Sequence, residues 1–448
     1  MTEGAAAARP HALYVALGFP PSRGSGVFRA LATAHGLLEA GFDVTVLTVD
    51  KDFWFHYTGA DEELEKQVDP RLRIVRVPLQ VPMQEWDLRR WSRSRVYAPR
   101  VWRKNQVRRD KAMEFPEVNY AAWADPVSEA AFRIHEERAV DVTVATVNPN
   151  VDAYAAYRLK ERHGVPYVVD QRDAWTLMQF TGERLHALDS PQVAWERRLF
   201  EAADEVWFVN NAMREWHGEV YPAAADRMRV VMNGWDPALL TPAPPRTGDG
   251  PVRFGFLGTL TTQVPLQAFL DGWHQALDDP AMAGAQADIR GHLGFYRAPN
   301  QQIANQLLDF ADDGVSYGGS VAKTAISSTY AEMDALLMLL GGGRFVTSGK
   351  VFEYVATGLP VVSVTPTDSG ANEVLRDYPM WFPAVSLEPS DVADALRACA
   401  AAVRASGPAE REACVAYAQR YRREVQLAPA LAAVRRIARL APHAEEAS

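Results

Sequence analysis

The chain has 448 residues and a formal net charge of -9, and its apolar and charged fractions are typical of soluble globular proteins. This length is too great for one ordinary hydrophobic core and indicates two or three domains. The negative charge makes the molecule as a whole a poor binder of polyanions, so we expect no nucleic-acid partner.

The chain contains only two cysteines, Cys399 and Cys414, which are too few for a disulfide framework or a cysteine-based metal cluster. The first apolar run, residues 12–17, is too short for the core of a signal peptide. No run approaches the ~20 apolar residues of a membrane-spanning helix. We therefore expect a cytoplasmic protein with no metal site, one that can still dock peripherally at the inner face of a membrane.

The first half of the chain alternates short apolar runs with helical stretches. A run at 13–17 precedes a Pro/Gly loop, a helical pattern over 27–40 and a second strand at 43–48. Further apolar runs lie at 142–147, 167–169 and 206–209. Fully apolar strands that alternate with helices predict a parallel sheet covered on both faces.

One segment, which we interpret as a basic insertion at about 51–130, breaks this alternation. Ten basic residues lie between 89 and 111, where Asp110 is the only acidic one. Aromatic residues are interleaved with them: Trp86, Trp91, Tyr97 and Trp102. This composition over 86–111 suits an anionic membrane surface, or a phosphorylated or lipid-linked acceptor. A solvated helical arm, with its aromatic side chains packed on its own domain, explains the pattern equally well.

The composition changes at 239–251, where prolines and glycines indicate a linker. The alternation then restarts, with a strand from 252, a helix from about 266 and strands near 287–289, 334–340 and 360–364. We therefore predict two Rossmann-like α/β domains, 1–238 and 252–424, that face each other across a cleft. Ligands bind such sheets at the carboxyl ends of the strands.

Residues 348–362 are the most informative stretch of the chain. They read as a loop, a short amphipathic helix, a glycine stop and a buried strand. Lys350 and Glu353 are three residues apart and share a helix face. An ammonium suits a diphosphate, and a carboxylate accepts from neighbouring sugar hydroxyls. The pair predicts a nucleotide-sugar site, assisted by the N–H groups of Ser348 and Gly349; an exposed ion pair is the structural alternative.

The loop at 20–29 places Gly24, Ser25 and Gly26 directly before the first helix, and we expect these residues, with Arg29, to form a loop that binds a phosphate or the acceptor. Glycine there lets backbone N–H groups approach a phosphate or a sugar hydroxyl at the positive end of the helix. A dinucleotide site would need a third glycine where Arg29 stands, although Asp50 after the second strand keeps that alternative open. A plain turn without a ligand is the third explanation.

Charged residues also follow the strand at 167–169, where Arg172 and Asp173 occur. This position suits a ligand site, and a structural Arg–Asp pair that holds the loop explains it equally well. Asn233 and Gly234, at the end of the first half, are typical of a turn.

These phrases, taken together, resemble a GT-B glycosyltransferase of family 4. The similarity includes the loop at 20–29 and the phrases at 41–48, 172–175, 203–206, 233–236, 256–259 and 348–360. It implies two Rossmann-like domains, a nucleotide-sugar donor held mainly by the second domain, and a final helix, 425–448, that returns to the first. It also implies transfer with retention at the anomeric carbon, without a required metal or cofactor.

The resemblance assigns roles to particular residues. Glu353 matches the position that binds the nucleotide ribose, and Lys350 with the main-chain N–H groups of Gly258 and Thr259 would contact the diphosphate. Our own hypothesis is that Arg172 and Asp173 are catalytic residues together with Lys350 and that they orient the acceptor. We expect a UDP- or GDP-linked donor and a hydroxyl acceptor, either lipid-linked or a small natural product, in polysaccharide or glycoconjugate biosynthesis.

Three positions depart from the family pattern. Phe345 stands where related enzymes often carry a second glutamate, and the segment 261–263 (Thr-Thr-Gln) replaces an expected Arg/Lys pair. Asn148, which we place in the acceptor loop, stands where a histidine commonly follows the strand. Two alternatives therefore stay open: a non-catalytic sugar-nucleotide-binding protein on the same scaffold, and an NAD-dependent dehydrogenase.

Overall fold

A computed structural model describes residues 9–438 apart from 25, 245, 247, 249, 295–299 and 323–324. The chain divides into two compact units. The first comprises Met1–Met178, Glu183–Met232 and Leu427–Ser448, and the second comprises Gln179–Gly182 and Asn233–Gln426. The main segment of the second unit thus begins at Asn233, before the segment 239–251 that we predicted as a linker.

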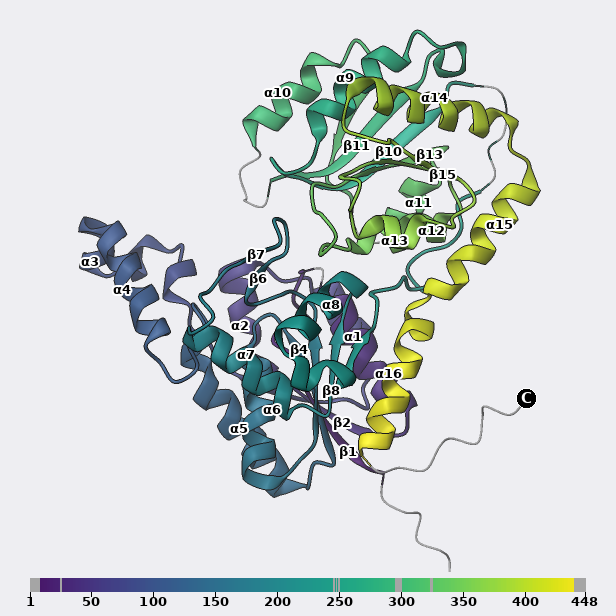
Figure 1. The fold of residues 1–448 in the computed structure, drawn as a ribbon. Helices are drawn as coiled ribbons and strands as arrows, with labels where there is room; N and C mark the ends of the chain where they lie inside the picture. Colours follow the sequence, from purple (N-terminus) through teal and green to yellow (C-terminus); the bar gives the residue numbers. More distant parts are fainter. Residues whose placement is uncertain are drawn as a thin grey trace, which may run out of the picture. The chain divides into compact units, whose positions relative to one another are not determined.

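The first unit is built on a parallel sheet of seven strands (Figure 1). They are β1 (His11–Val15), β2 (Asp43–Val49), β3 (Arg73–Val77), β4 (Val142–Val147), β5 (Tyr167–Gln171), β8 (Glu205–Phe208) and β9 (Met228–Val230). Their order across the sheet is β3-β2-β1-β4-β5-β8-β9, and all neighbours are parallel. The five central strands are buried almost throughout, which explains their uninterrupted apolar runs.

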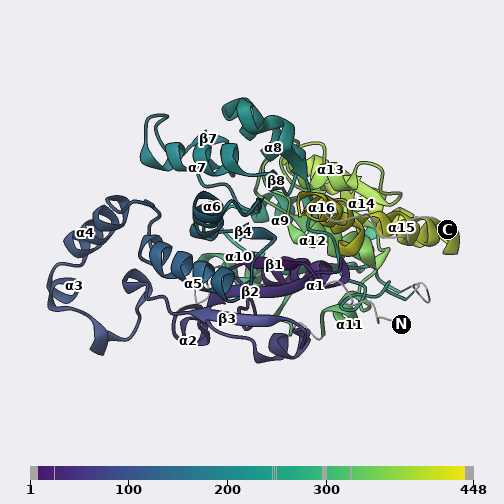
Figure 2. The same ribbon diagram turned by 90° about the horizontal axis from the view of Figure 1, so that it is seen from below.

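Helices cover both faces of this sheet (Figures 1 and 2). On one face lie α1 (Val27–Glu39) and the last helix, α16 (Arg423–Ile437), whose side chains share a core cluster with Trp207. On the other lie α5 (Ala124–Glu137) and α6 (Val151–His163), which contact each other and the strands. The unit also contains α7 (Pro191–Ala202), α8 (Asn211–Val220), η6 (Pro222–Arg227) and a two-stranded antiparallel pair, β6 (Leu177–Met178) and β7 (Glu183–Arg184).

The segment predicted as an insertion, 51–130, is only partly one. It supplies the edge strand β3 and the first half of the covering helix α5. It also forms α2 (Lys51–Phe53), η1 (Trp54–Thr58), η2 (Glu62–Gln67) and η5 (Ala121–Trp123). Residues 82–111, which we call the basic arm, contain η3 (Pro82–Gln84), η4 (Leu88–Arg90), α3 (Arg93–Tyr97) and α4 (Pro99–Lys111). In both ribbon views α3 and α4 project from the body of the first unit.

The second unit is built on a six-stranded parallel sheet in the order β12-β11-β10-β13-β14-β15. Its strands are β10 (Arg253–Leu260), β11 (Gln286–Leu293), β12 (Val315–Gly319), β13 (Ala335–Leu339), β14 (Val361–Val364) and β15 (Trp381–Pro383). The predicted pair of parallel-sheet α/β domains is therefore confirmed.

Helices again lie on both faces of the second sheet (Figure 1). On one face α9 (Leu266–Ala276) and α14 (Pro389–Ala405) bury a core in which Trp273 meets Phe254 edge to face, with 5.4 Å between ring centroids. On the other, α12 (Gly349–Thr357) lies against β10, where the N–H of Leu257 donates to the Tyr354 hydroxyl at 3.2 Å. The remaining elements are α10 (Gln301–Asp309), α11 (Ile326–Tyr330), α13 (Ala371–Leu375), α15 (Pro408–Ala418), η7 (Pro280–Met282) and η9 (Gln419–Tyr421).

The strand at the start of the chain differs from the prediction of 13–17. β1 begins at His11, because this buried polar side chain has partners inside the sheet: its Nε2 lies 2.8 Å from Oγ1 of Thr45. Among the described residues, no helix combines the length and apolar character that crossing a bilayer requires.

Candidate functional site

In the second unit, the helix α12 starts where the sequence predicts. Ser348 is its N-cap, and the Ser348 Oγ accepts from the Lys350 N–H at 3.3 Å. The helix ends at Gly358, whose φ of 71° lies in the left-handed region that glycine adopts readily. The N-terminus of this short helix lies beside the carboxyl end of β10.

The Lys350 side chain crosses β10. Its Nζ lies 5.1 Å from the centroid of the Phe256 ring, and it occupies the space above Gly258. A Cβ at Gly258 would stand 1.8 Å from that Nζ, so only glycine leaves room for the ammonium here. Burial lowers the pKa of Lys350, and the neighbouring Glu353 carboxylate opposes this shift. The predicted pair therefore shares one partly buried space.

Glu353 is positioned through a buried tyrosine. The Tyr330 hydroxyl donates to Oε2 of Glu353 at 2.9 Å. Burial, followed by the nearby carboxylate charge, raises the pKa of Tyr330 well above its usual range, so this hydroxyl stays a donor at neutral pH. Sequence reasoning missed Tyr330, because nothing in the sequence places α11 next to α12.

Near their carboxyl ends, the neighbouring strands β10 and β11 approach each other closely at two glycines. A Cβ at Gly291, on β11, would lie 1.6 Å from the Gly258 carbonyl oxygen, and Gly291 has a φ of +133°. Thr259 follows Gly258 on β10 and is partly buried. Gly349 is exposed at the first position of α12, and a Cβ there would meet nothing within 4 Å. The predicted donor-side positions thus gather at one edge of this sheet.

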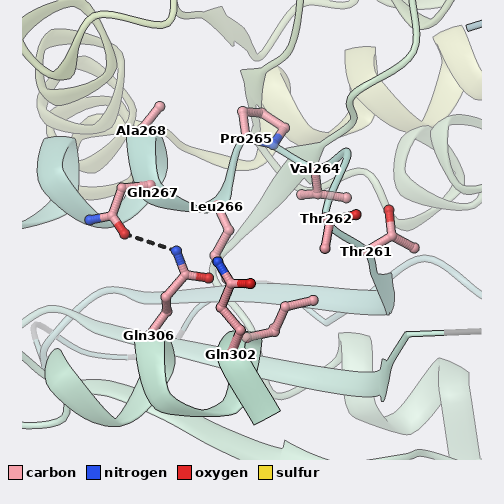
Figure 3. Close-up of a pocket in the computed structure, with 10 residues that line it drawn as sticks. Thr261, Thr262, Val264, Pro265, Leu266, Gln267, Ala268, Gln302 and Gln306 are labelled. Carbon is pink, nitrogen blue, oxygen red and sulfur yellow. Dashed lines mark hydrogen bonds between the residues drawn. The ribbon is translucent and has the colours of Figure 1, made fainter. Parts of the chain in front are cut away.

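A pocket of about 200 Å³ opens beside this edge (Figure 3). It is lined by Thr261, Thr262, Val264, Pro265, Leu266, Gln267, Ala268, Gln302, Ile303 and Gln306. None of these side chains is charged, and the Gln306 Nε2 donates to the Gln267 Oε1 at 3.0 Å. The segment that replaces the expected Arg/Lys pair therefore borders a neutral, amide-rich hollow. Phe345, at the position of the expected second glutamate, is buried and has the Arg344 guanidinium 4.8 Å from its ring centroid.

In the first unit, three predicted residues meet at the ends of neighbouring strands. Asn148 follows β4, and its Nδ2 donates to Oδ2 of Asp173 at 2.7 Å. Arg172, after β5, donates from Nη1 to the same oxygen at 3.3 Å. A Cβ at Gly26 would lie 2.8 Å from that Nη1, so the start of α1 belongs to the same cluster. Arg172 and Asp173 are both partly exposed, which leaves them accessible to a ligand.

Asn148 has a backbone conformation that points to a special position. Its φ is 95°, in a region that residues other than glycine occupy at a cost of about 1–3 kcal/mol. Asparagine tolerates positive φ better than most residues. With this backbone conformation the Asn148 side chain reaches Asp173, so Asn148 helps to position that carboxylate.

Arg29 requires a correction, because we predicted it for a phosphate-binding loop. It is buried and pairs with Asp170, with 2.8 Å between Nε and Oδ2 and 2.6 Å between Nη2 and Oδ1. Its Nη1 donates to the Val231 carbonyl at 2.9 Å. These partners tie α1 to β5 and to the end of the first sheet, so Arg29 is structural. In the same loop the Gly24 N–H donates to the Ser22 Oγ at 3.3 Å, and Ser25 lies outside the described residues.

Sequence reasoning missed two carboxylates that are buried at the start of α6. Glu117 accepts from the N–H groups of Asn150 and Val151, each at 2.8 Å, and burial raises its pKa to about 7. Asp152 accepts from the Leu17 N–H at 2.8 Å, and burial raises its pKa well above the usual range. The sequence offered one indication of this site, since Asp152 stands among apolar residues at the start of α6. Among the described residues, no group of three or more His, Cys, Asp or Glu side chains could hold a metal ion.

Comparisons with known proteins agree with this architecture. A family model described as "Glycosyl transferase 4-like domain" matches residues 24–234. No curated protein matches the chain. Three solved structures are similar in fold at low sequence identity.

The first is a glycosyltransferase from Rickettsia africae ESF-5, with a TM-score of 0.64, 12% identity, and coverage of 96% of this chain and 98% of that chain. Sucrose-phosphate synthase from Thermosynechococcus elongatus has a TM-score of 0.63 at 13% identity, covering 96% and 99%. Anabaena HepE in complex with UDP has a TM-score of 0.60 at 14% identity, covering 94% and 99%.

Proposed function

We propose that this chain transfers a sugar from a nucleotide diphosphate sugar to a hydroxyl acceptor. The match of the glycosyl transferase 4-like model to residues 24–234 and the GT-B fold support this proposal. The second unit holds the donor and the first unit holds the acceptor. The observation that carries the proposal is the Lys350 ammonium above Gly258, at the carboxyl end of β10. The Anabaena protein that shares the fold was solved with UDP and with UDP-glucose, which supports a UDP-linked donor here; GDP is the alternative base.

The negative charge that develops on the departing diphosphate is the main charge that the protein must stabilise in this reaction. A full charge about 4 Å from a phosphate oxygen contributes roughly 4 kcal/mol at an effective dielectric constant near 20. A helix N-terminus presents only about half a charge. Lys350 therefore supplies the larger share, and the N–H groups of Gly258, Thr259, Ser348 and Gly349 assist it. Because burial lowers the pKa of Lys350, a nearby negative charge such as the Glu353 carboxylate helps to keep it protonated.

The transfer proceeds with retention at the anomeric carbon. The bond from that carbon to the diphosphate oxygen breaks, and a bond to the acceptor oxygen forms on the same face of the sugar. The acceptor proton passes to the departing diphosphate oxygen, so no separate base is required. The cationic side chain at 350 stabilises the leaving group, so the nucleotide sugar is the only co-substrate in this proposal.

Acceptor orientation falls to Arg172 and Asp173. Asp173 already accepts from two donors, Asn148 and Arg172, and a carboxylate has lone pairs for a further hydroxyl. Glu353, oriented by Tyr330, binds the ribose hydroxyls of the donor.

A thermal-shift panel of UDP, GDP, ADP and TDP, with NAD measured beside them, tests the donor class, because a ligand that binds only the native state raises the melting temperature. We expect either UDP or GDP to give the largest shift in melting temperature, and we expect Lys350→Ala to abolish that shift. The matching sugar nucleotide should then be hydrolysed slowly to free sugar. Tight binding with no turnover over hours would instead identify a sugar-nucleotide sensor, and a shift with NAD alone would identify a dehydrogenase.

A further inference from the structure

We propose that the basic arm, residues 82–111, is a docking surface for an anionic lipid bilayer. The inference is independent of the proposed reaction, since it concerns a part of the first unit far along the chain from the donor-side residues. It depends on three features of the arm: an internal strut, an exposed apolar tip and an excess of exposed positive charge.

The strut is Arg95. Its guanidinium carbon lies 4.0 Å from the centroid of the Trp91 ring and 4.6 Å from that of Trp102, so this side chain of α3 is held between a tryptophan that precedes α3 and a tryptophan of α4. Its Nη2 donates to the Glu85 carbonyl at 2.7 Å, and its Nη1 donates to the Pro82 carbonyl. Arg95 and these two tryptophans therefore fix the shape of the arm, and they are less exposed than the basic residues around them.

The tip is apolar although it faces water. Tyr97, at the end of α3, is 85% exposed, and Val96 and Val101 on either side are also exposed. Trp86 and Leu88, near the start of the arm, are 62% and 68% exposed. Aromatic and aliphatic side chains gain free energy when they enter the headgroup region of a bilayer, whereas they gain little from a soluble polyanion.

The positive charge of the arm is mostly free to meet lipid headgroups. Among the described residues, every basic residue from Arg89 to Lys111 except Arg95 is exposed. Two of the acidic residues are occupied: Asp87 pairs with Arg89 at 2.8 Å, and buried Asp110 accepts from the Asn119 N–H at 2.9 Å. Glu85 is also buried, against His56 at 2.7 Å. With ten basic and three acidic residues, the arm opposes in sign a chain whose net charge is -9.

The surface continues from the arm toward the loop between β7 and α7. Lys111, the last residue of α4, acts electrostatically on His186, whose pKa is lowered first by burial and then by that lysine. Leu185 and Leu188, on either side of His186, are exposed. An arm resting on a bilayer would thus bring an apolar loop of the same unit to the same surface.

Vesicle co-sedimentation of the full chain tests the proposal, with phosphatidylcholine vesicles that contain or lack phosphatidylglycerol. We expect binding only to the anionic vesicles, and binding that weakens as salt rises, because exposed charges are screened over about 8–10 Å at physiological ionic strength. Each basic residue near such a surface contributes about fivefold in affinity. The double variant Arg100→Gln/Arg103→Gln should therefore bind roughly 30-fold more weakly.

Matched variants separate the arm from general charge. Arg133→Gln/Arg376→Gln removes two exposed positive charges elsewhere and should bind as the parent does. Tyr97→Ser/Val101→Ser keeps the charge and should reduce affinity with little change in salt dependence. Equal binding to neutral and anionic vesicles, equal loss with both glutamine pairs, or binding of soluble polyphosphate with no vesicle binding would each overturn the proposal. Because the assay contains no donor, a failed transferase reaction does not affect its outcome.

Discussion

The ammonium of Lys350 and the backbone of Gly258 share a space that no other residue at 258 would leave open. A Cβ on Gly258 would stand 1.8 Å from Nζ and 2.1 Å from Cε of Lys350. Both residues belong to the second unit, one at the start of α12 and one near the end of β10. The pairing makes glycine 258 a requirement for the position of the ammonium.

Gly258→Ala should therefore lose activity while it stays folded. The flexible end of the lysine can move aside, so the cost to stability is small, but the ammonium leaves its place over the strand. A displacement of about 1 Å at a reacting centre can cost about 100-fold in rate. We expect a loss of that size in kcat/KM, with the melting temperature nearly unchanged. Gly250→Ala, where a Cβ meets nothing within 4 Å, is the control and should be silent.

Lys350→Ala should lose about 1,000-fold in kcat/KM, since roughly 4 kcal/mol of charge stabilisation disappears. The parent enzyme should bind nucleoside diphosphate more weakly as pH rises through the lowered pKa of Lys350, because the ammonium is then lost. Lys350→Arg should keep binding at high pH and show no such decline. Lys66→Ala, an exposed lysine, serves as the control. A parent enzyme whose diphosphate binding does not change at alkaline pH would contradict this role.

Asp173→Asn should raise the KM for the acceptor more than it changes donor binding, because the amide replaces an acceptor oxygen with a donor. Asn148→Ala should give a smaller change in the same direction, since it removes only one hydrogen bond to Asp173. Initial rates against acceptor concentration, with donor binding measured separately, check both. Activity abolished by Lys350→Ala but unaffected by Asp173→Ala would remove Asp173 from the acceptor site and leave the donor assignment intact.

Arg29→Met should destabilise the first unit by about 3–5 kcal/mol, because it leaves the buried Asp170 carboxylate without its partner. Asp170→Asn should act in the same direction. The double variant Arg29→Met/Asp170→Leu should cost less than the sum of the single changes, since no unpaired charge stays buried. Urea unfolding followed by tryptophan fluorescence measures this, and exposed Arg133→Ala should have little effect. Additive losses would show that the pair is not coupled.

Glu117 gives the first unit a stability that falls as pH rises. Its folded-state pKa is about 7 and its usual value is 4.5. Between these values the folded chain keeps a proton that the unfolded chain has released. The contribution is complete below about 4.5 and decreases toward 7, by at most about 1.4 kcal/mol per pH unit.

Glu117→Gln should therefore flatten the fall of melting temperature between these pH values. Asp152, whose pKa burial also raises, leaves a residual slope. Glu219→Gln, at an exposed position, should leave the parent profile unchanged. A Glu117→Gln profile as steep as the parent profile would show that this carboxyl keeps an ordinary pKa.

The central strands of both sheets could be predicted from the sequence, and the edge strands could not. The apolar runs at 43–48, 142–147 and 206–209 became buried strands, because a strand covered on both faces needs apolar side chains throughout. The strands without such a signal, β3, β9, β12 and β15, all lie at the edges of the two sheets. Edge strands are partly exposed, so their sequences mix polar and apolar residues and resemble loops.

The local chemistry around α12 could be read from neighbouring residues along the chain. The cap at Ser348, the stop at Gly358 and the spacing of Lys350 and Glu353 follow from helix geometry, which depends on neighbours along the chain. Tertiary structure decided which charges are available: Arg29 is taken up by Asp170, Asn148 and Arg172 meet at Asp173, and Glu117 and Asp152 are buried behind the first loop. These outcomes depend on partners many residues away, and burial is a property of the whole packed unit.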